Sequence, residues 1–160
     1  MFAVVLVVVS AVGAGAGVLM ARRNGEKAGG SVIADGTPVG TFSFGVTDCA
    51  SGQAFVPGFV GVDLRGSGSG QMPGSGEGEG GFDLRVVGTG DDAELWLYPK
   101  GSTTGAIQIR KRDCSEWDVR VDWAGVTVND VKTVSGHVMV ACAIGGGKLT
   151  AVVDFERCAL

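Results

Sequence analysis

Residues 114–123 read CSEWDVRVDW, and apolar side chains occupy every second position from Trp117 to Trp123. Charged side chains fill the positions between them. This alternation is typical of an antiparallel strand with one buried face and one solvated face. The pattern returns in HVMVACAI (137–144) and, after a run of glycines, in LTAVVDF (149–155). The last third of the chain therefore predicts successive strands joined by short turns.

Alternation also marks much of the chain before this stretch. Further strands are expected at 41–47, 54–64, 82–86, 94–98 and 106–112. Pro57 cannot donate to a strand ladder, so the segment at 54–64 is expected at an edge or a bulge. No stretch after residue 23 has apolar residues at helical spacing for more than one turn. We expect an all-β domain over 41–160, an antiparallel β-sandwich or small barrel of about eight short strands.

The chain opens with an uncharged, apolar run from Phe2 to Ala21, which is followed by Arg22 and Arg23. A helix of about 20 apolar residues can span a bilayer. Residues 1–23 are therefore interpreted as an N-terminal apolar helix, either a signal peptide or an uncleaved membrane anchor. As an anchor obeying the positive-inside rule, the two arginines would hold the domain in the cytoplasm.

The cysteine content favours export over that cytoplasmic orientation, because four cysteines in a small chain usually form disulfides outside the cytoplasm. We expect a secreted or cell-envelope protein, in contact with the membrane through residues 2–21 if the leader is not cleaved.

Two segments are rich in glycine. Residues 24–40 are predicted to be a Gly-rich tether that ends in a turn at Asp35–Pro38. Residues 65–81 read RGSGSGQMPGSGEGEGG and have almost no apolar side chains. Such a composition cannot repay the entropy of ordering by burial, so a long flexible loop is expected there.

Strand geometry discriminates among the three possible pairings of four cysteines. A tight hairpin at 145–147 would place Cys142 opposite a residue near 151 and leave Cys158 roughly 23 Å further along the ladder. A disulfide needs Cα atoms within about 7 Å, which disfavours a bridge between these two. A strand over 115–123 that returns through a loop near 124–132 brings Cys114 opposite Cys142. We predict the disulfides Cys114–Cys142 and Cys49–Cys158.

No constellation of residues specifies a reaction. The single histidine, His137, is predicted on the solvated face of its strand, without the partners of a hydrolytic triad. The acids Asp118, Asp122 and Glu94 are interpreted as solvated residues rather than as a glycosidase pair. Close Cys and His spacings are absent. We therefore expect no catalytic residues, no metal site and no cofactor.

The charge distribution argues against one class of partner. The net charge is −4, and acidic and basic residues are interspersed. Nucleic-acid binding selects clustered Lys and Arg, so no nucleic-acid partner is expected.

The aromatic residues provide the only candidate ligand contacts. Trp96 and Tyr98 share one face of their strand and can stack on a sugar or fill a groove. Trp117 and Trp123 share their face with two valines and are predicted in the core. We expect a non-enzymatic structural or interaction module of the cell envelope. The alternative is a glycan or small-ligand binding module that uses Trp96 and Tyr98.

Overall fold

The computed structural model describes residues 27–54, 59–71, 78–99 and 107–159. Nine strands form one antiparallel sheet in this part of the chain. They are β1 (Lys27–Thr37), β2 (Gly40–Ser51), β3 (Gly61–Gln71), β4 (Gly78–Val87), β5 (Glu94–Pro99), β6 (Ile107–Arg110), β7 (Cys114–Val128), β8 (Val131–Ile144) and β9 (Gly147–Cys158). Three short 3₁₀ turns join them, namely η1 (Gly52–Ala54), η2 (Gly90–Asp92) and η3 (Lys111–Asp113).

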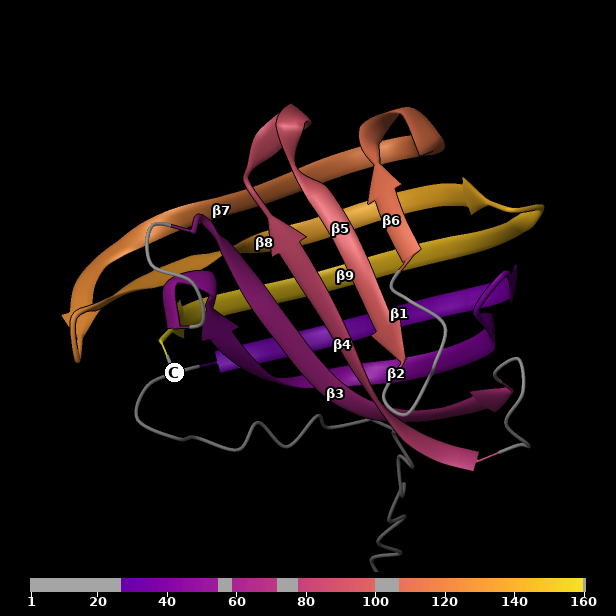
Figure 1. Ribbon diagram of the computed structural model, residues 1–160, viewed down its shortest axis with the longest axis horizontal. Helices are drawn as coiled ribbons and strands as arrows, with labels where there is room; N and C mark the ends of the chain where they lie inside the picture. Colours follow the sequence, from indigo (N-terminus) through magenta and orange to yellow (C-terminus); the bar gives the residue numbers. More distant parts are fainter. Residues whose placement is uncertain (1–26, 55–58, 72–77, 100–106, 160) are drawn as a thin grey trace, which may run out of the picture.

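The sheet curls into a nearly closed, barrel-like shape. Its strand order is β6-β5-β4-β3-β2-β1-β9-β8-β7, and in Figure 1 the steep strands β4–β6 cross in front of β7–β9. The edge strands β6 and β7 do not pair as a ladder. Contacts from the β4–β5 turn reach β7 instead: the Trp117 indole N–H donates to the Gly90 carbonyl (3.0 Å), and the Val121 amide donates to Thr89 Oγ1 (3.0 Å).

The core lies between the two crossing layers and follows the alternation of the sequence. Alternate residues in the central parts of β7, β8 and β9 point inward, including Val121, Val140 and Val153. Fully buried side chains also come from the other strands: Val32, Phe44, Val46, Val62, Leu64, Leu84, Val86, Leu95, Leu97 and Ile109. The all-β prediction is confirmed, and the sheet that forms has nine strands rather than eight.

Both predicted disulfides are present. Cys114 and Cys142 face each other across the β7–β8 ladder and are bonded. Cys49 of β2 is bonded to Cys158 of β9, two strands that flank β1. The Cys49–Cys158 bridge lies where β1 begins, since the Lys27 carbonyl is 3.9 Å from Cys49 Sγ.

The predicted tether over 24–40 is wrong for most of its length. Residues 27–37 form β1, which pairs with both β2 and β9 in the middle of the sheet. Val32 and Ala34 are buried, so this segment contributes to the core. Gly30 permits the close pairing, because a Cβ there would lie 2.1 Å from the Val152 carbonyl oxygen. The expected turn before residue 40 is present between β1 and β2.

The glycine-rich stretch at 65–81 was predicted to be a loop, and this is wrong for residues 65–71 and 78–81. These residues complete the ladder between β3 and β4, with Gly66 opposite Phe82 and Gly70 opposite Gly78. Residues 72–77 lie outside the described residues, so flexibility there stays a prediction. The segment at 54–64 was expected at an edge or a bulge because of Pro57, which lies outside the described residues. Its described part from Gly61 belongs to an interior strand, because β3 pairs with β2 and β4.

The two tryptophans predicted in the core have different environments. Trp117 is half-buried and packs against the core. Trp123 is 62% exposed, which contradicts the prediction. The ladder between β7 and β8 is irregular between Trp123 and Thr127, where the hairpin passes the end of the barrel. Trp123 lies at the start of this irregularity, and its ring is open to solvent.

The predicted N-terminal helix over residues 2–21 lies outside the described residues. Among the residues that are described, no helix has the length and apolar character required to cross a bilayer.

Candidate functional site

Trp96 and Tyr98 lie side by side on one face of β5, as the sequence predicted, and the structure shows that this is the outer face. Their ring centroids are 6.3 Å apart and their planes differ by 26°. The adjacent Leu95 and Leu97 point inward and are fully buried, which fixes the two aromatic residues on the outer surface. Both rings are half-buried, so part of each is open to solvent. We call these two rings the aromatic pair.

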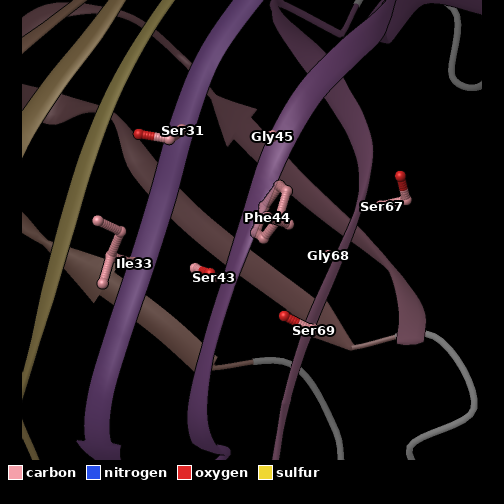
Figure 2. A pocket seen from close by; sticks show the side chains of 8 residues that line it. All are labelled: Ser31, Ile33, Ser43, Phe44, Gly45, Ser67, Gly68 and Ser69. Atoms are coloured by element: carbon pink, nitrogen blue, oxygen red, sulfur yellow. The ribbon is translucent and has the colours of Figure 1, made fainter. Parts of the chain in front are cut away.

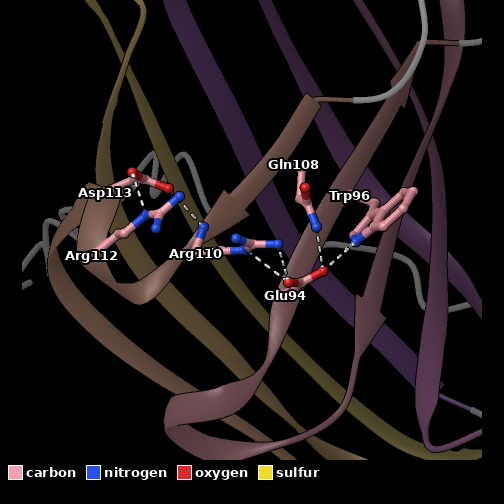
Figure 3. A network of polar contacts seen from close by, with 6 residues as sticks. All are labelled: Glu94, Trp96, Gln108, Arg110, Arg112 and Asp113. Carbon is pink, nitrogen blue, oxygen red and sulfur yellow. Dashed lines mark hydrogen bonds and ion pairs between the residues drawn. The ribbon is translucent and has the colours of Figure 1, made fainter.

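A carboxylate on the same strand orients the indole of Trp96. The Trp96 Nε1–H donates to Glu94 Oε2 at 3.2 Å, and the amide of Gln108 on β6 donates to the same oxygen. Arg110 holds the other oxygen, with Nε 2.7 Å from Glu94 Oε1. Figure 3 shows the three donors converging on Glu94 from β5 and β6. The polar edge of Trp96 is therefore bound within the protein.

These donors also fix the ionisation state of Glu94. The hydrogen bond from Gln108, aided by the hydrogen bond from Trp96 and the charge of Arg110, holds the pKa of Glu94 below its ordinary value. Partial burial opposes this effect and is outweighed. Glu94 is therefore ionised at neutral pH and holds no proton to donate as a general acid.

The second ring, Tyr98, is positioned from the neighbouring strand. The Arg85 guanidinium lies over the Tyr98 ring, 5.6 Å from its centroid. Arg85 is held by two hydrogen bonds to Asp63 on β3, from Nε to Oδ1 at 2.6 Å and from NH2 to Oδ2 at 3.0 Å. This hydrogen bond to Asp63 raises the pKa of Arg85. The paired carboxylate keeps the guanidinium in place beside the ring.

The aromatic pair therefore sits within a row of polar groups that runs across four strands. Asp63, Arg85, Trp96 and Gln108 are directly opposite one another in successive ladders. Each ring is held by a polar partner that is itself held, so little side-chain freedom would be lost on binding a ligand. Such a surface suits a ligand with both an apolar face and hydroxyl groups.

An open hollow of about 630 Å³ lies where β5 begins and β6 ends. It is lined by Asp91, Asp92, Ala93, Glu94, Arg110, Lys111 and Arg112. Its basic residues are paired with acids: Arg110 with Glu94 at 2.7 Å, Lys111 with Asp91 at 2.6 Å, and Arg112 with Asp113 at 3.8 Å. The charges around the hollow therefore balance one another.

A second hollow, of about 520 Å³, lies on the outer face of β1, β2 and β3. Figure 2 shows the hydroxyls of Ser31, Ser43, Ser67 and Ser69 around it. Gly45, which has no side chain, lies between Ser31 and Ser67 in the two ladders that border the hollow. Its lining carries no charged group and no exposed aromatic ring, so it provides less basis for recognition than the aromatic pair.

The acids considered for hydrolysis do not form a catalytic pair. Asp118 Oδ1 lies 2.9 Å from His137 Nε2, and Asp122 is paired with Arg120. Asp118 and Asp122 are four residues apart on one strand, a spacing of roughly 13 Å. Glycosidase carboxylates lie about 5 to 9.5 Å apart. His137 is on the outer face, as expected, and among the described residues its one side-chain partner is Asp118.

Metal-ligand geometry is also missing from the described part of the chain, where no three His, Cys, Asp or Glu side chains gather closely enough to hold an ion. The four cysteines are used in disulfides. The two bridges are consistent with a location outside the cytoplasm.

The sequence named Trp96 and Tyr98 as candidate contacts and missed the residues that position them. Arg85, Gln108 and Asp63 reach the pair through the registers of β3, β4, β5 and β6. The alternating pattern places each of them on an outer face, and only the registers show which residues are neighbours.

Comparison with known proteins identifies no relative: no protein-family model, no curated protein and no solved structure matches this chain. The functional argument therefore depends on the site itself.

Proposed function

We propose that this protein is a non-enzymatic β module of the cell envelope that acts by presenting its outer surface to a partner. The observation that supports this proposal is the pair of disulfides, Cys49–Cys158 and Cys114–Cys142, which persist in an oxidising compartment. The uncharged run from Phe2 to Ala21 supports export. The ion-paired state of Asp118, Asp122 and Glu94 supports a function without catalysis.

Thiol labelling in the native host tests this location. Protein isolated without reduction should show no reactive thiol, because all four cysteines are oxidised outside the cytoplasm. Labelling after denaturation and reduction should find four thiols and serves as the control. Four thiols that react before reduction would place the domain in the cytoplasm and overturn the envelope proposal.

A second candidate function is binding of a glycan or another small ligand at the aromatic pair. The near-parallel rings of Trp96 and Tyr98, 6.3 Å apart, favour it, together with the charged and amide groups around them. Apolar ring faces would contact the C–H face of a sugar, while Arg85 and Gln108 lie close enough to the rings to donate to its hydroxyls.

Fluorescence titration of the purified protein against a glycan panel separates the two functions. A sugar that binds should change the tryptophan emission of the wild-type protein. Trp96→Ala should weaken that binding at least about tenfold, or about 1.4 kcal/mol. Trp123→Ala removes an exposed tryptophan of β7, a strand that is not a neighbour of β5 in the sheet, and is the matched control, expected to leave affinity unchanged. If no sugar binds, or if both variants weaken binding equally, the glycan function is wrong.

A further inference from the structure

The hairpin formed by β7 and β8 extends beyond the barrel and exposes apolar side chains. Trp123 is 62% exposed, Val126 49% and Val128 40%. The hairpin turns at Asn129 and Asp130, both with positive φ, and the positive angles match the twist of a two-residue turn. Figure 1 shows this hairpin running out past the rest of the sheet, on the side where β1 begins and the chain ends.

The register of the sheet places the hairpin tip relative to the start of the domain. Lys27, the first residue of β1, is opposite Glu156, and the adjacent Phe155 is opposite Gly136 of β8. Six residues separate Gly136 from the turn at Asp130, so the tip lies roughly 20 Å beyond the start of β1 along the strand direction.

The chain that precedes β1 is short. Six residues lead from Ala21, the last residue of the apolar run, to Lys27. Even fully extended, they reach roughly 20 Å. If the apolar run enters a bilayer, the end of the barrel where β1 starts is held within that distance of the lipid surface. The hairpin tip projects by the same distance from the same end of the barrel.

We propose that the β7–β8 hairpin rests on the bilayer that residues 2–21 enter, with Trp123, Val126 and Val128 in the headgroup layer. This inference rests on the proposed envelope location with an uncleaved leader.

The composition of the hairpin suits the interface rather than the bilayer core. Tryptophan is enriched at the membrane–water boundary, where its ring is apolar and its N–H is hydrated. The Lys132 ammonium lies over the Trp123 ring, 5.7 Å from its centroid, and its long stem lets the charge reach the headgroups. Asp130 in the turn is charged, so the tip stays within the headgroup layer and does not reach the hydrocarbon core.

A second apolar side chain supports the same orientation. Val60, just before β3, is 54% exposed. It lies at this end of the barrel, since Val62 is opposite Ser51 and the adjacent Ala50 bridges to Ala159. A membrane at this end would leave the aromatic pair on the barrel side accessible to a partner.

The test uses the full chain reconstituted into phosphatidylcholine vesicles that carry bromine on the upper acyl chain. Two variants each keep one reporter: Trp96→Phe with Trp117→Phe leaves Trp123, and Trp117→Phe with Trp123→Phe leaves Trp96. Relative to vesicles without bromine, emission from Trp123 should fall by about half, because its ring lies in the headgroup layer. Emission from Trp96 should be nearly unchanged.

Substitutions in the hairpin test whether its apolar side chains make the contact. Val126→Ser with Val128→Ser should remove most of the quenching of Trp123. Val152→Ser, an exposed valine in the middle of the outer face of β9, is the matched control and should preserve it. Oxidised disulfides and an unchanged circular dichroism spectrum establish that each variant is folded.

Flotation of the vesicles after an alkaline wash measures anchoring separately from the hairpin contact. The chain can float while bromine quenches Trp123 no more than it quenches Trp96. The chain is then anchored but the hairpin does not touch the lipid, and the inference is wrong. Trp123 shielded from both lipid bromide and aqueous iodide would indicate a protein partner or a second copy there, and would also overturn it. A chain that does not float removes the premise and the inference together, whereas thiol labelling decides the envelope location independently.

Discussion

Gly66, Gly68 and Gly70 occupy successive inward positions of β3, opposite Val46, Phe44 and Phe42 of β2. The two strands approach so closely that a Cβ on Gly68 would lie 1.9 Å from the Ser43 carbonyl oxygen and 2.5 Å from Phe44 Cα. The buried rings of Phe42 and Phe44 fill the space that side chains on β3 would otherwise occupy. Glycine here is a packing requirement, because larger residues would force the ladder apart.

A single methyl group tests this requirement. Gly68→Ala should destabilise the domain by about 2 to 3 kcal/mol, since the methyl group meets backbone atoms that cannot move without breaking strand pairing. Gly45→Ala is the matched control on the paired strand, where the nearest atom to a new Cβ is the Gly30 oxygen at 3.9 Å. Urea unfolding followed by circular dichroism measures both. Equal stability of the two variants would show that β3 does not pack as tightly as described.

Composition misled the sequence interpretation at these residues, although a correct signal was present. Residues 66–70 alternate glycine with serine, which is the period of a strand with small residues inside and hydroxyls outside. An inward position is usually recognised by its own apolar side chain. Here the inward positions of β3 are glycines, and the rings of Phe42 and Phe44 on β2 fill the space. A single sequence does not show which segment will provide it.

At the scale of the strands, β7, β8 and β9 were predictable because each alternates cleanly and is joined to the next by a tight turn. The predicted register was close: Cys142 was expected opposite a residue near 151 and is opposite Leu149. The difference arises because Gly145 and Gly146 alone form the turn, with φ of 57° and 91°, while Gly147 is already paired. The prediction for Cys114 was unaffected, since it depends on the other hairpin.

Strand β1 was missed for an identifiable reason. Val32, Ile33 and Ala34 are consecutive apolar residues, so they hide the alternation, and Ile33 is in fact exposed on the outer face. The strand is stabilised by pairing on both sides with β2 and β9. The pairing with β9 joins segments more than a hundred residues apart, and local sequence carries no information about it.

In the candidate site, too, some features follow from the sequence and others depend on the pairing of strands. That Trp96 and Tyr98 share a face follows from their spacing of two residues. Whether that face is inner or outer depends on Leu95 and Leu97 being the better core residues, which the structure establishes. The contacts of Arg85 and Asp63 with this face depend on registers between separate hairpins.

At the scale of the whole molecule, the sheet nearly closes but leaves β6 and β7 unpaired as a ladder. The two disulfides constrain different parts of this open barrel. Cys114–Cys142 joins neighbouring strands of one hairpin with a sequence separation of 28. Cys49–Cys158 has a separation of 109 and links the second strand to the last. The longer link joins β2 to β9 at the start of β1, where β1 does not yet pair with β2.

The two bridges should therefore contribute unequally to stability. In the chain-entropy account, a disulfide limits the unfolded chain, which gives roughly 3.5 kcal/mol for the shorter loop and roughly 5 kcal/mol for the longer one. We expect Cys49→Ser with Cys158→Ser to lower the midpoint of thermal unfolding by about 10 °C or more, and Cys114→Ser with Cys142→Ser to lower it less. Each double variant retains the other bridge and serves as the control for removal of buried sulfur. Circular dichroism during heating, with the wild-type protein in reductant as the lower limit, gives the order directly. If full reduction leaves the midpoint unchanged, the core alone stabilises the barrel. If loss of the shorter bridge lowers the midpoint more, local hairpin geometry rather than loop length sets the contribution of each bridge.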